Sequence, residues 1–162
     1  TNVGKVDLKA KSLQEKNTAK YIAPFAKVAD DRGGAIGWKL TAKLTDGKIK
    51  TIEGNELPGA ELKVQLGRFL GKDIPVQSVP AIPANFNSDV TDNLTVLNGA
   101  DVNIVSANAG AGQGETVVSF GERLEDEKET DRVQLAIADT NQILAGKKYT
   151  GKIVWTLNDT PA

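Results

Sequence analysis

Apolar and polar side chains alternate strictly along residues 37–45, whose sequence is GWKLTAKLT. Successive side chains of a β-strand point to opposite faces of its sheet, so this order separates the two kinds of residue. One face carries Trp38, Leu40, Ala42 and Leu44, and the other carries Lys39, Thr41, Lys43 and Thr45. The segment is therefore predicted to be a strand with one face in a hydrophobic core and the other in water.

The same two-residue period recurs in three further segments, at 61–69 (ELKVQLGRF), 132–139 (RVQLAIAD) and 148–158 (KYTGKIVWTLN). Shorter strand candidates lie at 6–10, 20–28, 94–97, 102–106 and 115–120. Turn signals rich in Gly, Asp, Asn and Pro lie at 31–34, 45–48, 56–60, 97–101 and 110–114. Pro24 predicts that the strand around it is an edge strand or is bulged, because proline cannot donate to a sheet ladder.

Clean alternation in four segments predicts antiparallel sheets that keep one face wet. A length of 162 residues fits one domain, and no linker divides the chain. We therefore predict an all-β fold, an antiparallel two-sheet β-sandwich that is immunoglobulin-like or related, with residues 1–162 forming a single domain.

The composition limits which side chains could act in catalysis or bind a metal, because the chain contains neither cysteine nor histidine. Thiol and imidazole catalysis and nearly all transition-metal sites are thereby excluded, and we expect no metal and no cofactor. The net charge of −1 gives no overall attraction to nucleic acid or to an anionic membrane. No apolar run is long enough for a membrane span. Because methionine is also absent, we expect either a processed chain or an excised part of one, without any signal peptide.

The chain's two tryptophans, Trp38 and Trp155, are each followed two places later by a leucine, Leu40 and Leu157. In a strand, such a pair lies on one face. One interpretation puts both pairs in the core, and the other makes them a platform on which sugar rings or lactyl-peptide chains stack. We expect at least one tryptophan in the core and favour Trp155, whose strand carries further apolar residues on the same face.

Lysines occupy the polar faces of both tryptophan strands. They are Lys39 and Lys43 in the first strand and Lys148 and Lys152 in the second. If the two strands are neighbours, these side chains form a basic strip that suits anionic wall polymers or the carboxylates of peptide stems. Contacts of this kind are screened by salt.

Three other segments have ordinary structural interpretations. The glycines at 110, 112 and 114 are followed by a strand pattern and not by the helix that a nucleotide-binding loop requires, so they predict a hairpin or bulge. The acidic run at 122–131 matches no calcium-loop spacing and is expected to be a solvated connector. The long irregular segment at 78–93 carries Asn and Asp residues at 85–93 that are expected to satisfy turn backbone.

Two segments resemble the signature motifs of the WxL-domain family of cell-surface proteins from Gram-positive bacteria. They are VADDRGGAIGWKLTAKL at 28–44 and YTGKIVWTLNDTPA at 149–162, with a glycine-rich stretch between them. The resemblance covers most of the chain from about Lys20 onward. It implies a secreted protein that attaches non-covalently to the cell wall, with peptidoglycan as ligand. It also implies partners, namely a WxL-interacting surface protein and a small wall-anchored protein.

We therefore expect a non-catalytic wall-binding domain on the surface of a Gram-positive bacterium. The alternative is an assembly module whose main ligand is a protein partner, which an unused edge strand or a large exposed apolar patch would favour. A carboxylate glycosidase would need two acids about 5–10 Å apart in a cleft, and no such pair is identifiable in the sequence.

Overall fold

The computed structural model of this chain describes residues 6–11, 13–14, 20–71, 74–78, 82–90, 94–122, 128–138 and 143–159. Apart from one short 3₁₀ turn, η1 (Thr45–Gly47), its regular elements are β-strands. They are β1 (Val6–Lys11), β2 (Leu13–Gln14), β3 (Tyr21–Ile22), β4 (Phe25–Asp30), β5 (Trp38–Leu44), β6 (Lys50–Thr51), β7 (Ala60–Val64), β8 (Arg68–Gly71), β9 (Ile74–Ser78), β10 (Phe86–Asn87), β11 (Thr95–Leu97), β12 (Val102–Ala107), β13 (Gly114–Ser119), β14 (Glu129–Ile137), β15 (Tyr149–Thr150) and β16 (Ile153–Asn158).

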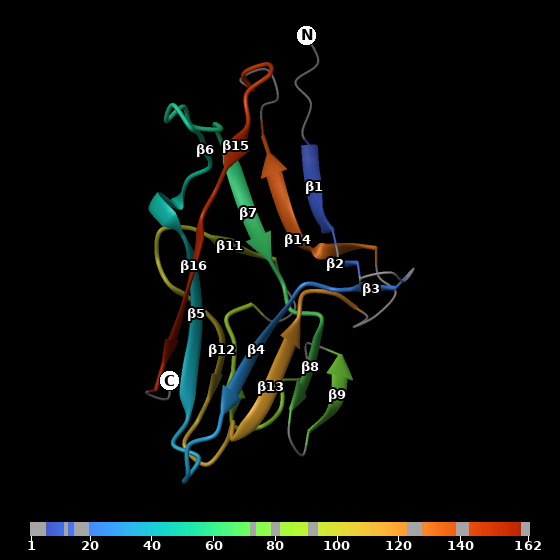
Figure 1. Ribbon diagram of the computed structural model, residues 1–162, viewed down its shortest axis with the longest axis vertical. Helices are drawn as coiled ribbons and strands as arrows, with labels where there is room; N and C mark the ends of the chain where they lie inside the picture. The colour runs from blue at the N-terminus through green and yellow to red at the C-terminus, as the bar shows by residue number, and fades with distance from the viewer. Residues whose placement is uncertain are drawn as a thin grey trace.

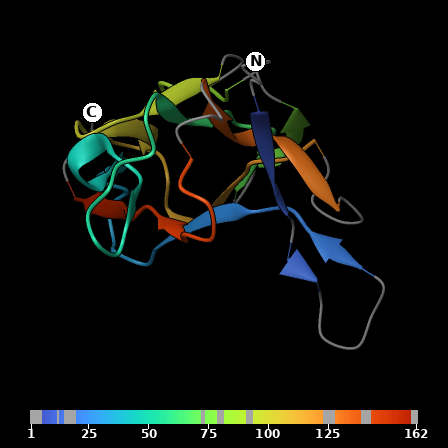
Figure 2. The same cartoon turned by 90° about the horizontal axis from the view of Figure 1, so that it is seen from above.

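The strands form three four-stranded sheets, in the orders β1-β14-β7-β11, β10-β12-β5-β16 and β4-β13-β8-β9, and two two-stranded sheets, β15-β6 and β2-β3. Every pairing between these strands is antiparallel. In Figure 1 the sheet with β4 and β13 lies in the lower half, β1, β14 and β7 lie in the upper half, and the β5–β16 pair runs along one side. The β2–β3 pair projects from the body of the sheets (Figure 2). The predicted all-β antiparallel sandwich is confirmed.

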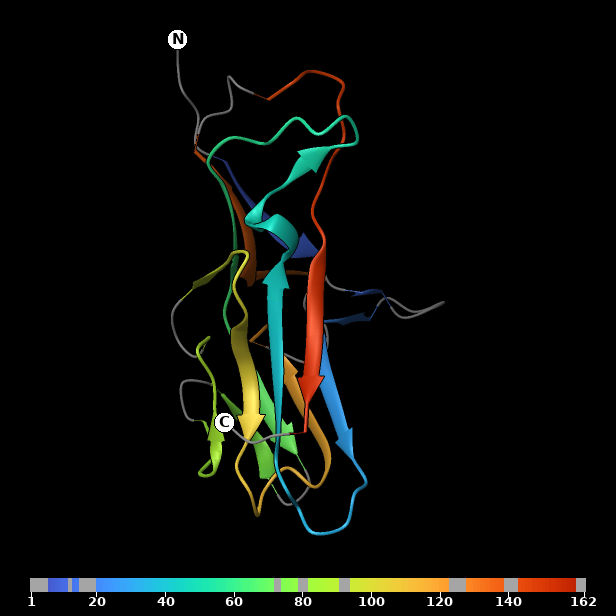
Figure 3. The ribbon, with the colours of Figure 1, turned by 90° about the vertical axis from the view of Figure 1, so that its left-hand side faces the viewer.

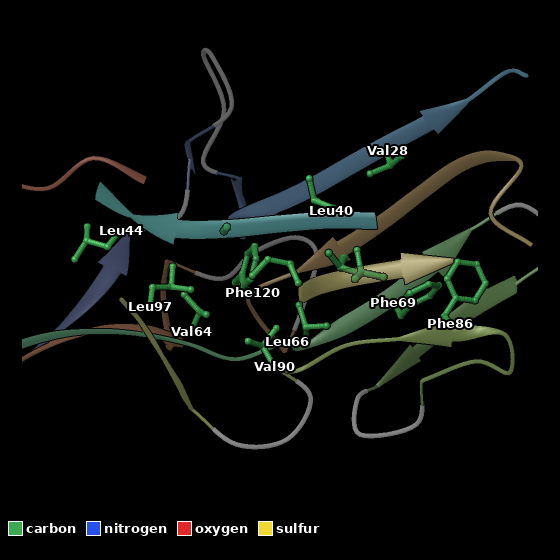
Figure 4. Packing of buried hydrophobic residues seen from close by; sticks show 14 of the residues in the cluster. Val28, Leu40, Leu44, Val64, Leu66, Phe69, Phe86, Val90, Leu97 and Phe120 are labelled. Carbon is green, nitrogen blue, oxygen red and sulfur yellow. The ribbon is translucent and has the colours of Figure 1, made fainter. Parts of the chain in front are cut away.

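The hydrophobic core lies between the sheets and follows the alternation of the sequence. Along β5 the apolar residues are buried, and Lys39 and Lys43 between them stay partly exposed, but Thr41, which the alternation predicts to face water, is also buried. Side chains from all three four-stranded sheets meet in one cluster (Figure 4). Those labelled there are Val28, Leu40, Leu44, Val64, Leu66, Phe69, Phe86, Val90, Leu97 and Phe120.

Two of the four alternating segments that the sequence predicts as single strands are each divided in the structure. Residues 61–69 split between β7 and β8, which belong to different sheets. The break falls at Gly67, whose N–H donates to the Ser119 carbonyl, and a Cβ there would lie 1.8 Å from the carbonyl oxygen of Gly121. Residues 148–158 split into β15 and β16 at Gly151, which packs against Leu44. A group that packs closely on a glycine therefore marks each break, the Gly121 backbone at Gly67 and the Leu44 side chain at Gly151.

Pro24 directly precedes β4, and its carbonyl accepts a hydrogen bond from the N–H of Phe120. Among the described strands, β4 is at the end of its sheet and pairs with β13 alone. The predicted edge strand is confirmed for β4, but the segment at 20–28 is divided into β3 and β4, and Pro24 lies between these strands and not inside one. Among the described strands, β16 likewise ends its sheet and pairs with β5 alone.

Candidate functional site

The two Trp-x-Leu strands, β5 and β16, are direct neighbours although they lie near opposite ends of the sequence. Leu157 is paired with Leu40, and Trp155 with Ala42. Residues directly opposite in an antiparallel pair share a face, so both Trp-x-Leu pairs belong to the core-facing side of this sheet. The prediction that the two strands pack together is confirmed.

Burial separates the two motifs. Trp38 is 1% exposed and Leu40 is 7% exposed, whereas Trp155 is 45% and Leu157 55% exposed. The prediction that at least one tryptophan is a core residue is confirmed, but the choice of Trp155 is wrong. Trp155 faces the core side of its sheet, but β16 is the edge strand, and the opposite sheet covers it only in part.

Trp38 is held in place by a hydrogen bond and by aromatic packing. Its Nε1–H donates to the carbonyl oxygen of Gly112 at 2.9 Å, and its ring meets Phe86 edge-on with 6.4 Å between centroids. At Gly112 the backbone has a φ of +80°, and a Cβ would lie 2.5 Å from the indole nitrogen. The glycine-rich loop therefore serves the tryptophan, which explains these glycines without a nucleotide.

An open groove separates β4 from β16, and two adjoining cavities lie along it. One, of about 310 Å³, is lined by Phe25, Ala26, Lys27, Leu40 and Trp155. The other, of about 220 Å³, is lined by Val28, Ala29, Asp30, Arg32, Trp38, Leu157, Asn158 and Asp159. We call the groove formed by these residues the seam. Figure 3 shows its two flanking strands side by side, β4 in blue and β16 in red.

The seam explains why the Trp-x-Leu pair occurs twice. Because β5 and β16 are antiparallel, the leucine of each motif lies near the tryptophan of the other. Leu40 and Trp155 line the larger cavity, and Trp38 and Leu157 line the smaller one. Each motif thus contributes one side chain to each cavity, with the β5 residues forming the floor and the β16 residues forming the exposed rim.

Asp30 and Arg32 form a polar cluster at one end of the seam. The buried Asp30 carboxylate accepts hydrogen bonds from Arg32 Nε at 2.7 Å and Nη2 at 3.1 Å, and Nη2 also donates to the Gly37 carbonyl at 2.9 Å. These bonds from Arg32 hold the pKa of Asp30 below its usual value, against the opposing effect of burial. The sequence predicted only a turn at 31–34, and this ion pair is what shapes it.

Lowering the pH should weaken this cluster. Because the pKa of Asp30 is lower in the folded chain, its contribution to stability is present above the ordinary carboxyl pKa of about 4 and is lost as pH falls below that value. We expect Asp30→Asn to melt well below the parent at neutral pH, with the difference shrinking in acid. Thermal melts across that range measure it, with Asp31→Asn, an exposed neighbour, as control. A melting difference that is independent of pH would contradict this account.

Three of the four predicted strip lysines lie on one face. Asn158 is paired with Lys39 and Val154 with Lys43, and Lys152, two residues before Val154, shares their side of the sheet. This is the outer face, opposite the seam. Lys43 lies 4.0 Å from Asp101, and Lys39 and Lys152 have no ion pair with any described residue. Lys148 lies apart, in a loop cavity with Ile52 and Glu53.

In the part of the chain that the structure describes, the remaining acidic segments form no cluster that could hold a metal ion. Glu122 contacts Arg132, and residues 123–127 of the acidic run lie outside the described residues. Asp89 accepts a hydrogen bond from the backbone N–H of Asn103 in β12, 14 positions along the chain, so this aspartate bonds to a strand and not to turn backbone as predicted. Within the described ranges there is no group of three or more metal-binding side chains. No helix in the same ranges is long and apolar enough to cross a membrane.

Comparison with known proteins gives one match. A protein-family model described as "WxL domain surface cell wall-binding" matches residues 3–161, which is nearly the whole chain. No curated protein and no solved structure matches the chain.

Proposed function

We propose that the chain, which belongs to the WxL domain family of surface, cell wall-binding domains, attaches non-covalently to peptidoglycan through the seam. A role at the cell surface in binding the wall follows from the family. The ligand and the site are our proposal. Secretion by a Gram-positive bacterium and a purely binding, non-catalytic role are also part of our proposal.

The exposure of Trp155 is the observation that carries this proposal. An indole that is 45% exposed at the rim of a groove offers a flat apolar face with a polar N–H, a combination suited to stacking on sugar rings. Its ring is supported from one side by Phe120, with 6.3 Å between centroids. Phe25, which is 47% exposed, lines the same cavity from β4. The seam thus presents aromatic side chains from both of its flanking strands.

A second candidate function is assembly with a protein, and one observation favours it. Both strands that flank the seam are sheet edges with exposed apolar side chains beside them, which is a common arrangement at protein interfaces. A WxL-interacting surface protein is the expected partner, and a small wall-anchored protein is expected in the same complex. In this case wall attachment would come through the partner.

Sedimentation with purified peptidoglycan distinguishes the two functions. The peptidoglycan is freed of proteins and of accessory polymers, so that no protein partner is present. We expect the purified domain to sediment with this material. A domain that stays in the supernatant, and sediments only after a surface-protein extract is restored, would contradict direct attachment and establish assembly as the function.

The basic face predicts how binding to whole walls depends on salt. Lys39, Lys43 and Lys152 share the outer face and are exposed or partly exposed to anionic wall polymers. The Debye length falls from about 10 Å at 0.1 M to about 3 Å at 1 M salt, so binding should weaken between these conditions. Replacing all three lysines by glutamine should remove most of this salt dependence, and Lys148→Gln should not. Binding that is equal at both salt concentrations would contradict a role for this face.

A further inference from the structure

The turn between β11 and β12 contains Asn98 followed by Gly99, and no other asparagine in the sequence is followed by glycine. Both residues are exposed, and they lie within the turn predicted at 97–101. The turn connects two sheets, since β11 pairs with β7 and β12 pairs with β5. A chemical change in this turn therefore affects how the two sheets are joined.

An asparagine followed by glycine can react with its own backbone. The backbone nitrogen of the glycine attacks the side-chain carbon Cγ, and the amide nitrogen of the side chain leaves as ammonia with the proton that the attacking nitrogen loses. The product is a five-membered cyclic imide. Water then breaks one of the two imide C–N bonds and leaves either aspartate or isoaspartate. Glycine permits this attack because it has no Cβ to obstruct the approach and its backbone rotates freely.

The side chain of Asn98 is held in a conformation that favours the reaction. Its Oδ1 accepts a hydrogen bond from the Ala100 N–H at 2.8 Å, which closes an Asx turn around Gly99. Attack on Cγ places negative charge on this same oxygen. A donor that is already aimed at the atom where charge develops stabilises the transition state. The Ala100 N–H is such a donor.

The nitrogen of Gly99 is available as the attacking group. Its N–H donates no hydrogen bond to any residue that the structure describes. Because the residue is exposed, hydroxide can remove the proton that the nitrogen must lose. No bond in the sheets has to break before the attack, so the reaction can take place in the folded chain.

A related pair of residues, Asp46 and Gly47 in η1, packs against the turn. A Cβ added to Gly47 would lie 3.0 Å from the backbone nitrogen of Gly99. The Asp46 carboxylate lies 3.8 Å from the Nζ of Lys50. Carboxyl groups are ionised at neutral pH, and an ionised carboxylate resists nucleophilic attack because its carbon already carries two electron-rich oxygens. We therefore expect Asp46 to stay unchanged while Asn98 reacts.

We propose that Asn98 is a site of self-modification, at which the folded chain converts this asparagine through a cyclic imide to aspartate and isoaspartate. The conversion needs water and neither an enzyme nor a cofactor. Either product adds one negative charge to the turn. Asp101 of the same turn lies 4.0 Å from Lys43 on the basic outer face, so the added charge falls at the end of that face.

Isoaspartate also changes the path of the backbone, because the chain then runs through the former side chain and gains one methylene group. The Asn98 carbonyl, which accepts the Leu44 N–H at 2.8 Å, leaves the main chain and becomes a carboxylate. The packing of Gly99 on Gly47 leaves little room for the extra length. Leu97 and Leu44 are both buried, at the same end of the core (Figure 4). The isoaspartate form should therefore be less stable.

Incubation of the folded domain at mildly alkaline pH tests the proposal. Peptide mapping by mass spectrometry follows the exchange of an amide for a carboxyl group, and an isoaspartate-specific methyltransferase provides a second measurement. We expect conversion at Asn98 before any other asparagine, including the exposed Asn55 and Asn158, and faster conversion as the pH rises. If Asn98 stays unchanged in the folded domain while a synthetic peptide of residues 94–102 converts, the fold protects the site and the proposal is wrong.

Gly99→Ala is the matched variant. The φ of Gly99 is not in the left-handed region, and an added Cβ would lie 3.6 Å from the Gly47 nitrogen, an ordinary contact, so the variant should fold. Conversion should slow at least tenfold, because the methyl group crowds the attacking nitrogen. Equal rates in the two proteins would overturn the proposal. If the variant does not fold, the comparison of the parent with the synthetic peptide decides.

Thermal melting of the separated products tests the effect on the fold. Ion exchange separates the modified chain from the parent by its added charge, and the isoaspartate form should melt several degrees lower. The Asn98→Asp variant, which carries the same charge on an unchanged backbone, should melt close to the parent. Equal melting of the isoaspartate form and this variant would contradict the effect that we assign to the longer backbone.

Discussion

Replacing Trp38 by alanine is expected to lower the free energy of unfolding by about 3–5 kcal/mol, the usual cost of removing a large buried aromatic side chain. The indole is 1% exposed, packs on Phe86 and donates to the Gly112 carbonyl. Truncation leaves a cavity, and it also leaves that carbonyl without its partner. Because a domain is typically stable by about 5–15 kcal/mol, this one substitution removes a large part of the total.

Denaturant unfolding of the parent and the Trp38→Ala variant measures this effect. Trp155→Ala is the matched control, because it removes the same side chain from the neighbouring strand at a half-exposed position. The control should melt within a few degrees of the parent. If both variants lost the same stability, the unequal burial of the two motifs would be wrong.

The Trp155→Ala variant is expected to lose wall binding while it remains folded. Truncation of an aromatic hot spot commonly costs about 2 kcal/mol or more, which is about a thirtyfold loss of affinity. Trp155 lines the larger cavity of the seam and is exposed over nearly half its surface. Sedimentation with purified peptidoglycan over a range of polymer concentrations measures the affinity.

A control for this experiment must remove exposed apolar surface elsewhere. Ile52 is 96% exposed and lies in the loop cavity beside Lys147 and Lys148, which shares no residue with the seam. Ile52→Ala should bind peptidoglycan as the parent does. If Trp155→Ala binds equally well, the seam is not the wall-binding site, whatever the family's general role.

Much of the fold could be predicted from the sequence, because the alternation of apolar and polar residues indicates which face of a strand is buried. It correctly placed Trp38 and Leu40 in the core and Lys39 between them on the more exposed face, but it wrongly placed the buried Thr41 there too. It could not report whether the opposite sheet extends over a given strand. Trp155 has the same pattern as Trp38, yet it lies on an edge strand, and its exposure depends on the sheet order of the whole domain.

The seam could not be predicted from any one segment. It requires the antiparallel register of β5 and β16, the edge position of β4 and the turn held by Asp30 and Arg32. The alternating pattern of residues 61–69 likewise gave no sign of a break, since the break results from the approach of Gly67 to Gly121 across the fold. The periodicity of one segment carries no information about contacts between residues far apart in the sequence.

The unequal burial of the two indoles also has an optical consequence. Trp38 sits in an apolar interior with its N–H bonded to a carbonyl, so its fluorescence should be blue-shifted and inaccessible to aqueous quenchers until the chain unfolds. Trp155 should emit at longer wavelength and be quenched readily. The chain therefore carries two native chromophores, one reporting the integrity of the interior and the other the occupancy of the groove. Replacing either tryptophan with phenylalanine leaves a single-probe protein, in which folding and binding can be followed separately without a label.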